Sequence, residues 1–325
     1  MMTKRELKRT AAKPSLDFSI PKVQIHQGAS TLNQLQKLKE GTKERIDWAG
    51  GILNIPAIWR QTQGAGVKVA ILDTGIDTDH PDLESAIILS KDFTGDGIED
   101  NNGHGTHCAG IVGARLNGVG FVGVAPQAEL LIAKVLGNDG RGASAWIADG
   151  IYWAVDNDAD IISMSLGASQ SSPEIYQAVQ YALYNGVFVI CAAGNEGELF
   201  TNSVGYPGRY GGVITVAAHD INGNPSGFSS RGGEVDVMAP GTEIWSTYKD
   251  GGYQSLSGTS MATPFVAGLA ALITAKHKST ASNNTPLQNN EDLKNHLLLM
   301  ATHPGYHDNQ TGYGPLQPFT YFNQS

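Results

Sequence analysis

The sequence predicts an α/β protein with a three-layer fold, in which a doubly wound, mostly parallel sheet carries helices on both faces. Short apolar runs, of the kind that form strands buried on both faces, alternate along the chain with longer segments of helical periodicity. The 40 glycines are too many for a helical bundle and suit a fold with many turns and close backbone approaches. With 325 residues, of which 41% are hydrophobic, the chain is long enough for one large domain of this kind.

The expected strands and helices alternate in chain order. The pattern begins at residues 67–73, a short apolar run that ends in Thr74-Gly75 and suits a buried parallel strand. Short connections between such elements favour right-handed crossovers, which place helices on both faces of the sheet. Further strands are expected at residues 86–89, 129–136, 160–164, 187–192 and 213–218. Helices are expected at residues 52–59, 104–116, 143–157, 173–185, 260–276 and 291–301.

The segment 260–276 is predicted to be a helix buried on every side, because nearly every residue from Met261 to Ala275 is apolar or small. Pro264 would lie in its first turn, where the missing N–H group costs nothing. Ser260 would stand at the helix N-terminus, where free N–H groups and the helix dipole favour developing negative charge. This position suits a nucleophile, and it also suits an ordinary helix-capping serine.

Residues 1–43 are polar and weakly patterned, and we expect them to form an extension in front of a globular domain at residues 44–325. A two-turn helix is expected where Leu32, Leu35 and Leu38 recur with amphipathic spacing. The basic residues at the start are not followed by the apolar core of a signal peptide, which favours a cytoplasmic location. Secretion is the alternative if this N-terminus is not that of the native precursor.

Composition excludes several classes of partner. The 22 basic and 31 acidic residues give a formal net charge of −9, with no basic cluster beyond the first residues, which excludes nucleic acid. No run of 18 apolar residues is present, so no membrane span is expected. Cys108 and Cys191 each lie in an apolar stretch and are expected to be buried thiols rather than a disulfide. The glycine pattern of residues 118–123 follows a helix instead of a strand, so it is not assigned to dinucleotide binding.

Polar residues lie where predicted strands end or helices begin. Asp73 closes a buried strand, where a carboxylate is costly unless it is hydrogen-bonded. His104 and Ser260 each open a helix, so the chain order is acid, histidine and serine. Asn195 follows a strand that ends in small residues, and taken alone it would be only a turn residue. Because functional side chains of a parallel sheet lie beyond the carboxyl ends of its strands, Asp73 and Asn195 are expected on one edge.

Three motifs together resemble the subtilisin family of serine proteases: Asp-Thr-Gly at residue 73, His-Gly-Thr-His-Cys-Ala-Gly at residue 104 and Gly-Thr-Ser-Met-Ala-Thr-Pro around residue 260. Their order is the one known for subtilisin itself. The resemblance covers about residues 44–315. It implies a serine endopeptidase in which Ser260 attacks the scissile carbonyl, His104 transfers the proton and Asp73 fixes the histidine tautomer. It also implies an oxyanion hole formed by the Asn195 side chain and the Ser260 backbone N–H.

The same resemblance assigns the residues that would bind polypeptide substrates. A substrate would lie as an added strand between residues 140–142 and residues 165–167, whose glycines allow close approach. The pocket for the side chain before the cleaved bond would have small walls and no charge at its base, and would accept large apolar residues. A second apolar pocket would lie beside Ser144, Ile147 and Leu166. The residues implied are Gly140, Gly142, Ser165, Leu166 and Gly167 for the strand, and Ala192, Gly194 and Gly205 for the first pocket.

Calcium is the cofactor that the resemblance implies, in a structural role. Side-chain oxygens of Asp82 and Asn117 would bind the ion, with Glu44 as an additional donor. The alternative is that Asp82 forms a salt bridge and Asn117 a turn, without an ion. The backbone carbonyls in the implied ligand set are those of Arg115, Val119 and Phe121.

Two neighbours of His104 have their own interpretations. His107 lies three residues further along, but no third metal ligand is evident beside this pair, so His107 is expected to be structural. Cys108 resembles a thiol that some relatives pack behind the catalytic histidine. Because burial raises the pKa of such a thiol, we expect it not to act as a nucleophile, and we expect mercurials to inhibit by displacing His104.

The short extension resembles that of the intracellular subtilisins, in which such a segment lies across the cleft and holds the enzyme inactive. Residues 19–23 would take that place, because Pro21 prevents normal backbone pairing beside the nucleophile. A solvated tail without this role is the alternative. Two other functions are open to the fold: a peptide ligase that passes the acyl group to an amine, and a peptide-binding module that does not cleave.

Overall fold

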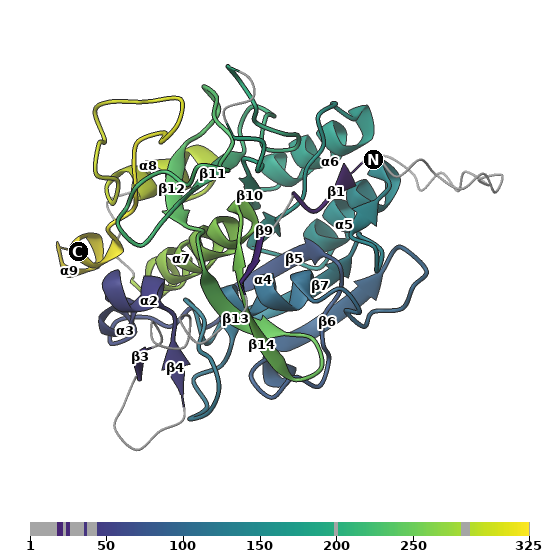
Figure 1. Cartoon of the computed structure of the whole chain (residues 1–325), viewed down its shortest axis with the longest axis horizontal. Coiled ribbons are helices and arrows are strands. Elements are labelled where there is room, and N and C mark those ends of the chain that lie inside the picture. The colour runs from purple at the N-terminus through teal and green to yellow at the C-terminus, as the bar shows by residue number, and fades with distance from the viewer. Residues whose placement is uncertain are drawn as a thin grey trace.

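A parallel sheet of seven strands lies at the centre of the computed structural model (Figure 1). The strand order across the sheet is β12-β11-β10-β9-β5-β7-β6, so the chain begins in the middle and extends to both edges. The structure describes residues 18–21, 24–26, 36–37, 44–197, 201–280 and 287–324. The strands of this sheet are β5 (Lys68–Asp73), β6 (Ile87–Asp92), β7 (Glu129–Lys134), β9 (Ile161–Met164), β10 (Phe188–Ala192), β11 (Ile214–His219) and β12 (Val237–Pro240).

Side chains of successive strand residues enter two different apolar cores, one on each face of the sheet. In β5, Val69 and Ile71 pack with helices α4 (His104–Gly113) and α7 (Thr259–Ser279). Ala70 and Leu72 pack on the opposite face with α5 (Ser144–Asp156) and α6 (Pro173–Tyr184). This alternation follows from the two-residue period of a strand and explains why both faces need apolar residues. The predicted three-layer α/β fold is confirmed.

Smaller elements cover the α4 and α7 side of the sheet. The hairpin of β13 (Ile244–Tyr248) and β14 (Gly252–Ser257) packs on α4, where the Thr247 hydroxyl donates to the Thr106 carbonyl at 2.8 Å. Buried residues of the remaining helices join the same core. These elements are α2 (Trp48–Ile52), α3 (Ile55–Ile58), the 3₁₀ turn η1 (Glu84–Ala86), α8 (Asn290–Leu298) and α9 (Pro318–Gln324).

Several boundaries differ from the sequence-based expectation. The single helix expected at residues 52–59 is wrong, because Asn54 adopts a left-handed conformation with φ of 55° and separates α2 from α3. Helix α4 ends at Gly113 rather than at residue 116, since the chain turns away and the Arg115 N–H bonds to the Asp82 carbonyl at 2.8 Å. Strand β12 and the hairpin of β13 and β14 were not predicted.

Short pieces of the N-terminal region pair with strands of the main fold. Strand β1 (Phe18–Ser19) is antiparallel to β8 (Arg141–Gly142), and β2 (Gln24–His26) is antiparallel to β14. Strand β3 (Gln36–Lys37) is antiparallel to β4 (Arg45–Ile46). The helix expected around Leu35 is therefore wrong at residues 36–37, and its other residues lie outside the described part.

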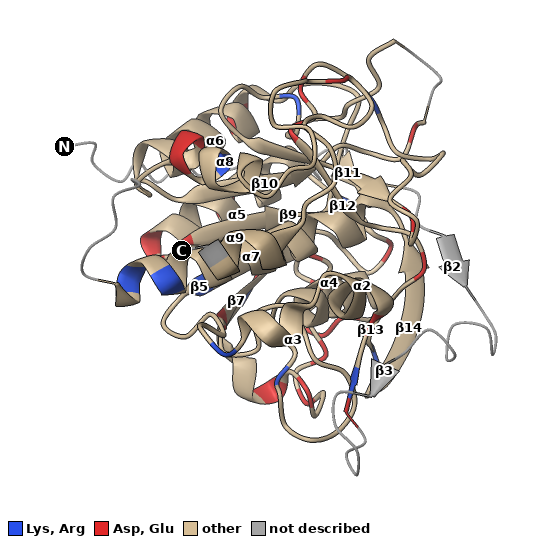
Figure 2. Cartoon of the chain, turned by 90° about the vertical axis from the view of Figure 1, so that its left-hand side faces the viewer, with Lys and Arg blue, Asp and Glu red and all other residues tan. Residues whose placement is uncertain are grey.

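Charged residues occupy mainly loops and helix ends, while the central helices and strands are mostly uncharged (Figure 2). Lys276, His277 and Lys278 lie in the last turn of α7, where cations favour the negative end of the helix dipole. Within the described ranges, no helix is both long and apolar enough to cross a membrane.

Candidate active site

Ser260 is the second residue of α7, directly after Thr259, and it is fully buried. Pro264 lies inside this helix, one turn beyond Ser260, and not in the first turn as expected. A proline has no N–H to bond to the carbonyl four residues earlier, so the Ser260 carbonyl is released from the helical pattern. That carbonyl accepts the Ser165 hydroxyl at 2.9 Å and the Cys108 thiol at 3.4 Å. Side chains from two other segments therefore hold the start of α7.

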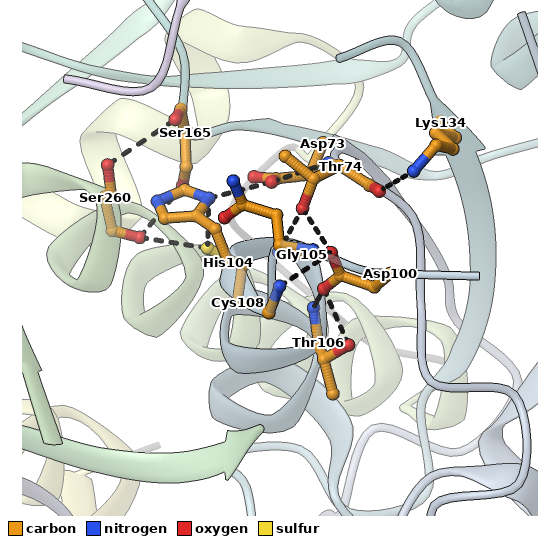
Figure 3. Close-up of polar contacts among 12 residues, drawn as sticks. Asp73, Thr74, Asp100, His104, Gly105, Thr106, Cys108, Lys134, Ser165 and Ser260 are labelled. Carbon is orange, nitrogen blue, oxygen red and sulfur yellow. Dashed lines mark hydrogen bonds and ion pairs between the residues drawn. The ribbon is translucent and has the colours of Figure 1, made fainter. Parts of the chain in front are cut away.

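Asp73 and His104 are in direct contact. Asp73 ends β5, His104 begins α4, and Asp73 Oδ1 lies 2.7 Å from His104 Nδ1. The Thr74 N–H donates to the same carboxylate oxygen at 2.7 Å. Both side chains are buried, and Figure 3 shows the imidazole ring between Asp73 and Ser260. The three predicted residues thus lie near one another at the carboxyl edge of the sheet, where the Ser260 hydroxyl donates to the Ser165 carbonyl at 3.5 Å.

The electrostatics of His104 suit a proton acceptor. Burial alone would lower the pKa of its ring, but the Asp73 carboxylate raises it well above the ordinary value of 6.5. Its Nε2 atom is buried without a hydrogen-bond partner among the described residues. Because Nδ1 faces Asp73, Nε2 is the nitrogen left to accept a proton.

His107 and Cys108, which lie further along the same motif, have different surroundings. His107 Nε2 bonds to the carbonyls of Ile244 and Gln254, at 3.1 Å each, and so ties α4 to the hairpin of β13 and β14. Burial lowers the pKa of His107 from 6.5 to about 3, so the ring is neutral near pH 7. Burial also raises the pKa of the Cys108 thiol, whose Sγ lies 3.9 Å from His104 Nδ1. Both observations agree with structural roles.

Asn195 is oriented by the residue that precedes Ser260. Its Oδ1 accepts both the backbone N–H and the hydroxyl of Thr259, each at 2.9 Å. Since both hydrogen bonds use the amide oxygen, Thr259 does not occupy the amide N–H₂ group of Asn195. Thr259 was not singled out from the sequence, because a threonine beside a serine carries no signal of this contact.

The segment that contains β1 lies between the two predicted substrate-binding segments. Ser19 exchanges two backbone hydrogen bonds with Gly167, of 3.1 and 2.9 Å. The Ile20 N–H donates to the Gly140 carbonyl at 3.0 Å, and Phe18 pairs with Gly142. A Cβ atom on Gly140 would come within 2.9 Å of the Ile20 side chain, and φ at this glycine is +76°. Glycine at this position therefore permits the close approach of a second strand.

Phe18 is buried in an apolar core of the main fold. Its side chain is 1% exposed and belongs to the same core as Leu136, Ile147 and Leu166. Burial of a phenylalanine on this scale contributes roughly 1.5–3 kcal/mol. This core thus holds one end of the N-terminal segment.

Comparison with known proteins agrees with this geometry. The model of the Subtilase family matches residues 64–314. The chain is 51% identical to the intracellular serine protease of Paenibacillus polymyxa over 230 residues, which are 68% of this chain and 71% of that protein. It is 45% identical to the major intracellular serine protease of Bacillus subtilis (strain 168) over 249 residues, covering 74% and 76% of the two chains. It is 43% identical to subtilisin BL of Lederbergia lenta over 267 residues, covering 81% and 93%.

The chain belongs to the subtilase family. Serine endopeptidase activity follows from this membership, since the relatives are serine proteases at 43–51% identity. The resemblance found in the motifs is therefore confirmed.

A cavity of about 600 Å³ opens next to Asn195 in this subtilase. Pro21 of the N-terminal segment lines it, together with three of the predicted glycines, Gly167, Gly194 and Gly205. Ala192, also predicted here, is instead the buried last residue of β10 and does not line the cavity. The charged residues in the lining are Glu196 and Arg209.

Glu196 and Arg209 were not expected in this lining, for which the sequence predicts small walls and no charge at the base. Arg209 Nε lies 3.4 Å from Glu234 Oε1, and its guanidinium lies 5.8 Å from the ring centre of Tyr206. Sequence reasoning missed Arg209 because a basic residue after Tyr-Pro-Gly gives no sign of which way it faces. A paired and stacked arginine presents less free charge to the cavity than an isolated one.

The loop predicted to bind calcium surrounds a buried carboxylate. Asp82 is fully buried, and its oxygens accept the Phe121 N–H at 2.8 Å, the Asn117 amide at 3.1 Å and the Tyr253 hydroxyl at 2.8 Å. All three donors are neutral, and among the described residues no basic side chain forms a salt bridge with Asp82. The salt-bridge alternative is thus unsupported, while the alternative turn is present, since Asn117 Oδ1 accepts the Val119 N–H at 3.0 Å.

A second acidic side chain reaches the same loop. Glu44 is buried, and its Oε1 accepts the N–H groups of Asn117 and Gly118 at 2.8 and 3.1 Å. Within the described residues, no donor reaches the carbonyls of Arg115, Val119 or Phe121. Two buried carboxylates and free carbonyl oxygens form a donor set of the hard-oxygen type that Ca²⁺ prefers.

Proposed function

We propose that this subtilase hydrolyses peptide bonds through an acyl-enzyme on Ser260. The serine Oγ attacks the scissile carbonyl while His104 Nε2 takes its proton and later delivers it to the leaving amine. Asp73 holds the ring in the required tautomer and stabilises its charged form. The Asn195 amide and the Ser260 N–H stabilise the oxyanion.

One observation carries this proposal. Asp73 Oδ1 contacts His104 Nδ1 at 2.7 Å, so the other ring nitrogen, Nε2, faces the start of α7, where Ser260 lies (Figure 3). In the part of the chain that the structure describes, this Nε2 atom has no hydrogen-bond partner. A carboxylate, an imidazole and a hydroxyl in this order are the arrangement that activates a serine nucleophile.

We propose that the substrates are extended polypeptides that add a strand beside residues 140–142 and 165–167. The pairing of β1 with β8 supports this proposal, because it shows that this edge accepts an extended backbone. A large apolar side chain before the cleaved bond fits the cavity of about 600 Å³, with Gly167, Gly194 and Gly205 supplying small walls.

We propose that residues 1–43 form an inhibitory extension of a catalytic domain at residues 44–325. Residues 18–21 occupy the proposed substrate edge, and the extension pairs with β14 shortly before Ser260. Pro21 is buried at the cavity and has no N–H with which to pair as a substrate residue would. His104 is only 2% exposed and Ser260 is inaccessible, as expected of a covered site.

We propose that the loop at Asp82 binds a structural Ca²⁺ ion through Asp82, Asn117, Glu44 and backbone carbonyls of Arg115, Val119 and Phe121. The buried carboxylates without a salt-bridge partner among the described residues support this assignment. The ion would balance their charge and fix the loop against α4.

We propose a cytoplasmic location. Two of the relatives carry the word intracellular in their names. Cys108 and Cys191 are buried free thiols, which suit a reducing compartment.

Labelling and hydrolysis together test the function. The full-length protein is incubated with a serine-directed fluorophosphonate and with a fluorogenic peptide, and Ser260→Ala serves as the control. Labelling with hydrolysis, both absent in Ser260→Ala, is expected. Labelling with ligation of added peptides would indicate a transacylase. Absence of both reactions in the wild type and also in Phe18→Ala, which loosens the proposed inhibitory segment, would indicate a binding module.

A further inference from the structure

Asp100 is a buried carboxylate that the mechanism above does not use. Its Oδ1 accepts the Thr74 hydroxyl at 2.8 Å and the N–H groups of Asn102 and Gly103 at 3.2 and 2.8 Å. Its Oδ2 accepts the N–H and the hydroxyl of Thr106, at 2.8 and 2.7 Å. The side chain is 3% exposed, so these five hydrogen bonds are made away from solvent. Charge-assisted bonds of this kind are stronger and shorter than neutral ones.

These hydrogen bonds connect the two elements that carry the acid and the base. Thr74 follows the last residue of β5, while Gly103 and Thr106 belong to the start of α4. Gly103 caps α4 without a side chain, so the Asp100 carboxylate supplies the acceptor that this helix end otherwise lacks. The Asp100 carboxylate therefore joins the end of β5 to the first turn of α4 (Figure 3).

Thr74 extends the connection to both residues of the dyad. Its hydroxyl accepts the Gly105 N–H at 2.9 Å, next to His104 in the first turn of α4. Its backbone N–H donates to Asp73 Oδ1, the atom that contacts the imidazole. A Cβ atom on Gly105 would lie 2.3 Å from the Gly75 carbonyl, so α4 is pressed directly against the end of β5. The contact between helix and strand is thus set by hydrogen bonds rather than by side-chain bulk.

Lys134 braces this connection from the neighbouring strand β7. Its side chain is completely buried, and its Nζ donates to the Thr74 carbonyl and, at 3.1 Å, to the Glu99 carbonyl. Burial lowers the pKa of Lys134, and nearby carboxylates, Asp100 first among them, oppose that change. Thr74 is therefore held by Asp100 through its hydroxyl and by Lys134 through its carbonyl.

We propose that Asp100 is a positioning residue for the peptidase reaction. Acting through Thr74 and the first turn of α4, it fixes the distance and direction between the Asp73 carboxylate and the His104 ring. This inference depends on the proposed roles of Asp73, His104 and Ser260.

Asp100→Asn tests the inference, because it removes the charge while keeping the size of the side chain. The matched control is Asp308→Asn, since Asp308 also accepts N–H groups of its own loop, from Gln310 and Thr311, without reaching β5, β7 or α4. All measurements use the full-length chain. An intramolecular inhibitor that competes with substrate changes the apparent KM rather than kcat, so kcat at saturating fluorogenic peptide reports on the dyad.

We expect Asp100→Asn to lower kcat at least about tenfold with little change in KM, because small misplacements of a catalytic group carry large costs. In the Ser260→Ala background, which is not degraded by its own activity, the downfield proton NMR signal of His104 Nδ1–H should move or broaden. Asp308→Asn should change neither quantity. An Asp100→Asn protein that behaves like Asp308→Asn, or that loses thermal stability alone, would overturn the proposal.

A second pair of variants decides the matter if Asp100→Asn fails to fold. Thr74→Val removes the hydroxyl that links Asp100 to Gly105, and Thr74→Ser restores it. We expect Thr74→Val to lower kcat and shift the Nδ1–H signal, and Thr74→Ser to recover most of both. Equal behaviour of the two variants would contradict the inference. Absence of fluorophosphonate labelling in both the wild type and Phe18→Ala would instead refute the proposed function, while the NMR comparison would remain interpretable.

Discussion

At the proposed oxyanion site, the Asn195 side chain is oriented by Thr259, the residue that precedes the proposed nucleophile. Thr259 gives both its N–H and its hydroxyl to Asn195 Oδ1, so the amide is held before a substrate arrives. A donor fixed in advance needs no reorganisation when negative charge develops. The contribution of Asn195 should therefore appear in kcat.

We expect Asn195→Ala to lower kcat by about 10²–10³, a magnitude adopted from subtilisin itself, with a small effect on KM. Steady-state kinetics on a fluorogenic peptide measure both constants. Asn185→Ala is the matched control, because Asn185 caps the end of α6, where its amide bonds to the Tyr181 carbonyl at 2.7 Å. An unchanged kcat in Asn195→Ala would remove this residue from the mechanism.

His107 makes the stability of the protein depend on pH. Burial lowers the pKa of its folded-state ring to about 3, whereas the unfolded ring titrates near 6.5. Between pH 6.5 and about pH 3, the unfolded chain binds a proton on His107 that the folded chain does not bind. The contribution of His107 to the free energy of unfolding is therefore complete above pH 6.5 and is lost as the pH falls toward 3. At about pH 5 the loss is about 2 kcal/mol.

Urea unfolding at neutral pH and at about pH 5 measures this effect. The free energy of unfolding of the wild type should fall by about 2 kcal/mol more than that of His107→Gln, which keeps a donor but cannot titrate. The comparison with His107→Gln is needed because Asp47 also titrates in this range, with the opposite effect. Burial raises the pKa of Asp47 to about 7, so its contribution destabilises the fold as the pH rises. Equal pH dependence of the two proteins would show that His107 does not titrate as described.

At the scale of elements, two strands of two residues each carry the proposed inhibitory contact. The pairing of β1 with β8 accompanies the burial of Phe18 in an apolar core and places Ile20 against Gly140. Such short strands have little stability of their own, so the side chain of Phe18 supplies much of the attachment.

We expect Phe18→Ala to raise the initial rate of peptide hydrolysis by the full-length chain at least about tenfold, since large buried side chains contribute several kcal/mol. The rate is taken at once after mixing, before the chain cuts its own extension. Ser19→Ala is the control, because the Ser19 side chain is exposed and its two backbone bonds to Gly167 persist. Equal rates for wild type and Phe18→Ala would contradict an inhibitory role.

The large elements could be predicted from sequence because each combines a strong period with clear ends. The apolar run of β5 stops at Asp73, and the run of small residues in α7 starts at Ser260, so the motif residues were placed at the correct edge. The hairpin of β13 and β14 was missed because its residues alternate weakly, and its pairing depends on contact with α4.

The remaining errors have local causes. Pro264 was expected in the first turn, but the helix tolerates it further in because Ser165 and Cys108 satisfy the carbonyl that it frees. The N-terminal strands were unpredictable as elements, since β1 and β3 have two residues each and exist only through pairing with distant segments.

At the scale of the whole molecule, the loop at Asp82 joins separate parts of the chain. Tyr253 of β14 bonds to the Asp82 carboxylate, and the Arg45 N–H donates to the Gly120 carbonyl at 2.8 Å. The Arg115 N–H connects the end of α4 to the same region. An ion bound here would thus stabilise contacts among the hairpin, α4 and the entry to the domain.

We expect chelation with EGTA to lower the Tm of the wild type by roughly 5–10 °C. This is the shift expected in a chain of this size for an ion whose dissociation constant lies well below its working concentration. Asp82→Asn should have a lower Tm that no longer responds to EGTA. Asp220→Asn is the control, because Asp220 holds a separate turn through Asn222 and Asn224, and its response should match the wild type. An unchanged wild-type Tm after chelation would favour the ion-free turn.

Because the segment that pairs with β8 belongs to the same chain, its effective concentration at the cleft is of the order of millimolar, and dilution does not alter it. A single cut between this segment and the domain would convert that local concentration into the far lower concentration of a free peptide. Release would then be effectively one-way, so an activated molecule would not return to the closed state. Under the proposed inhibition, the proportion of active protein would depend on the fraction of molecules already cleaved and not on a reversible equilibrium.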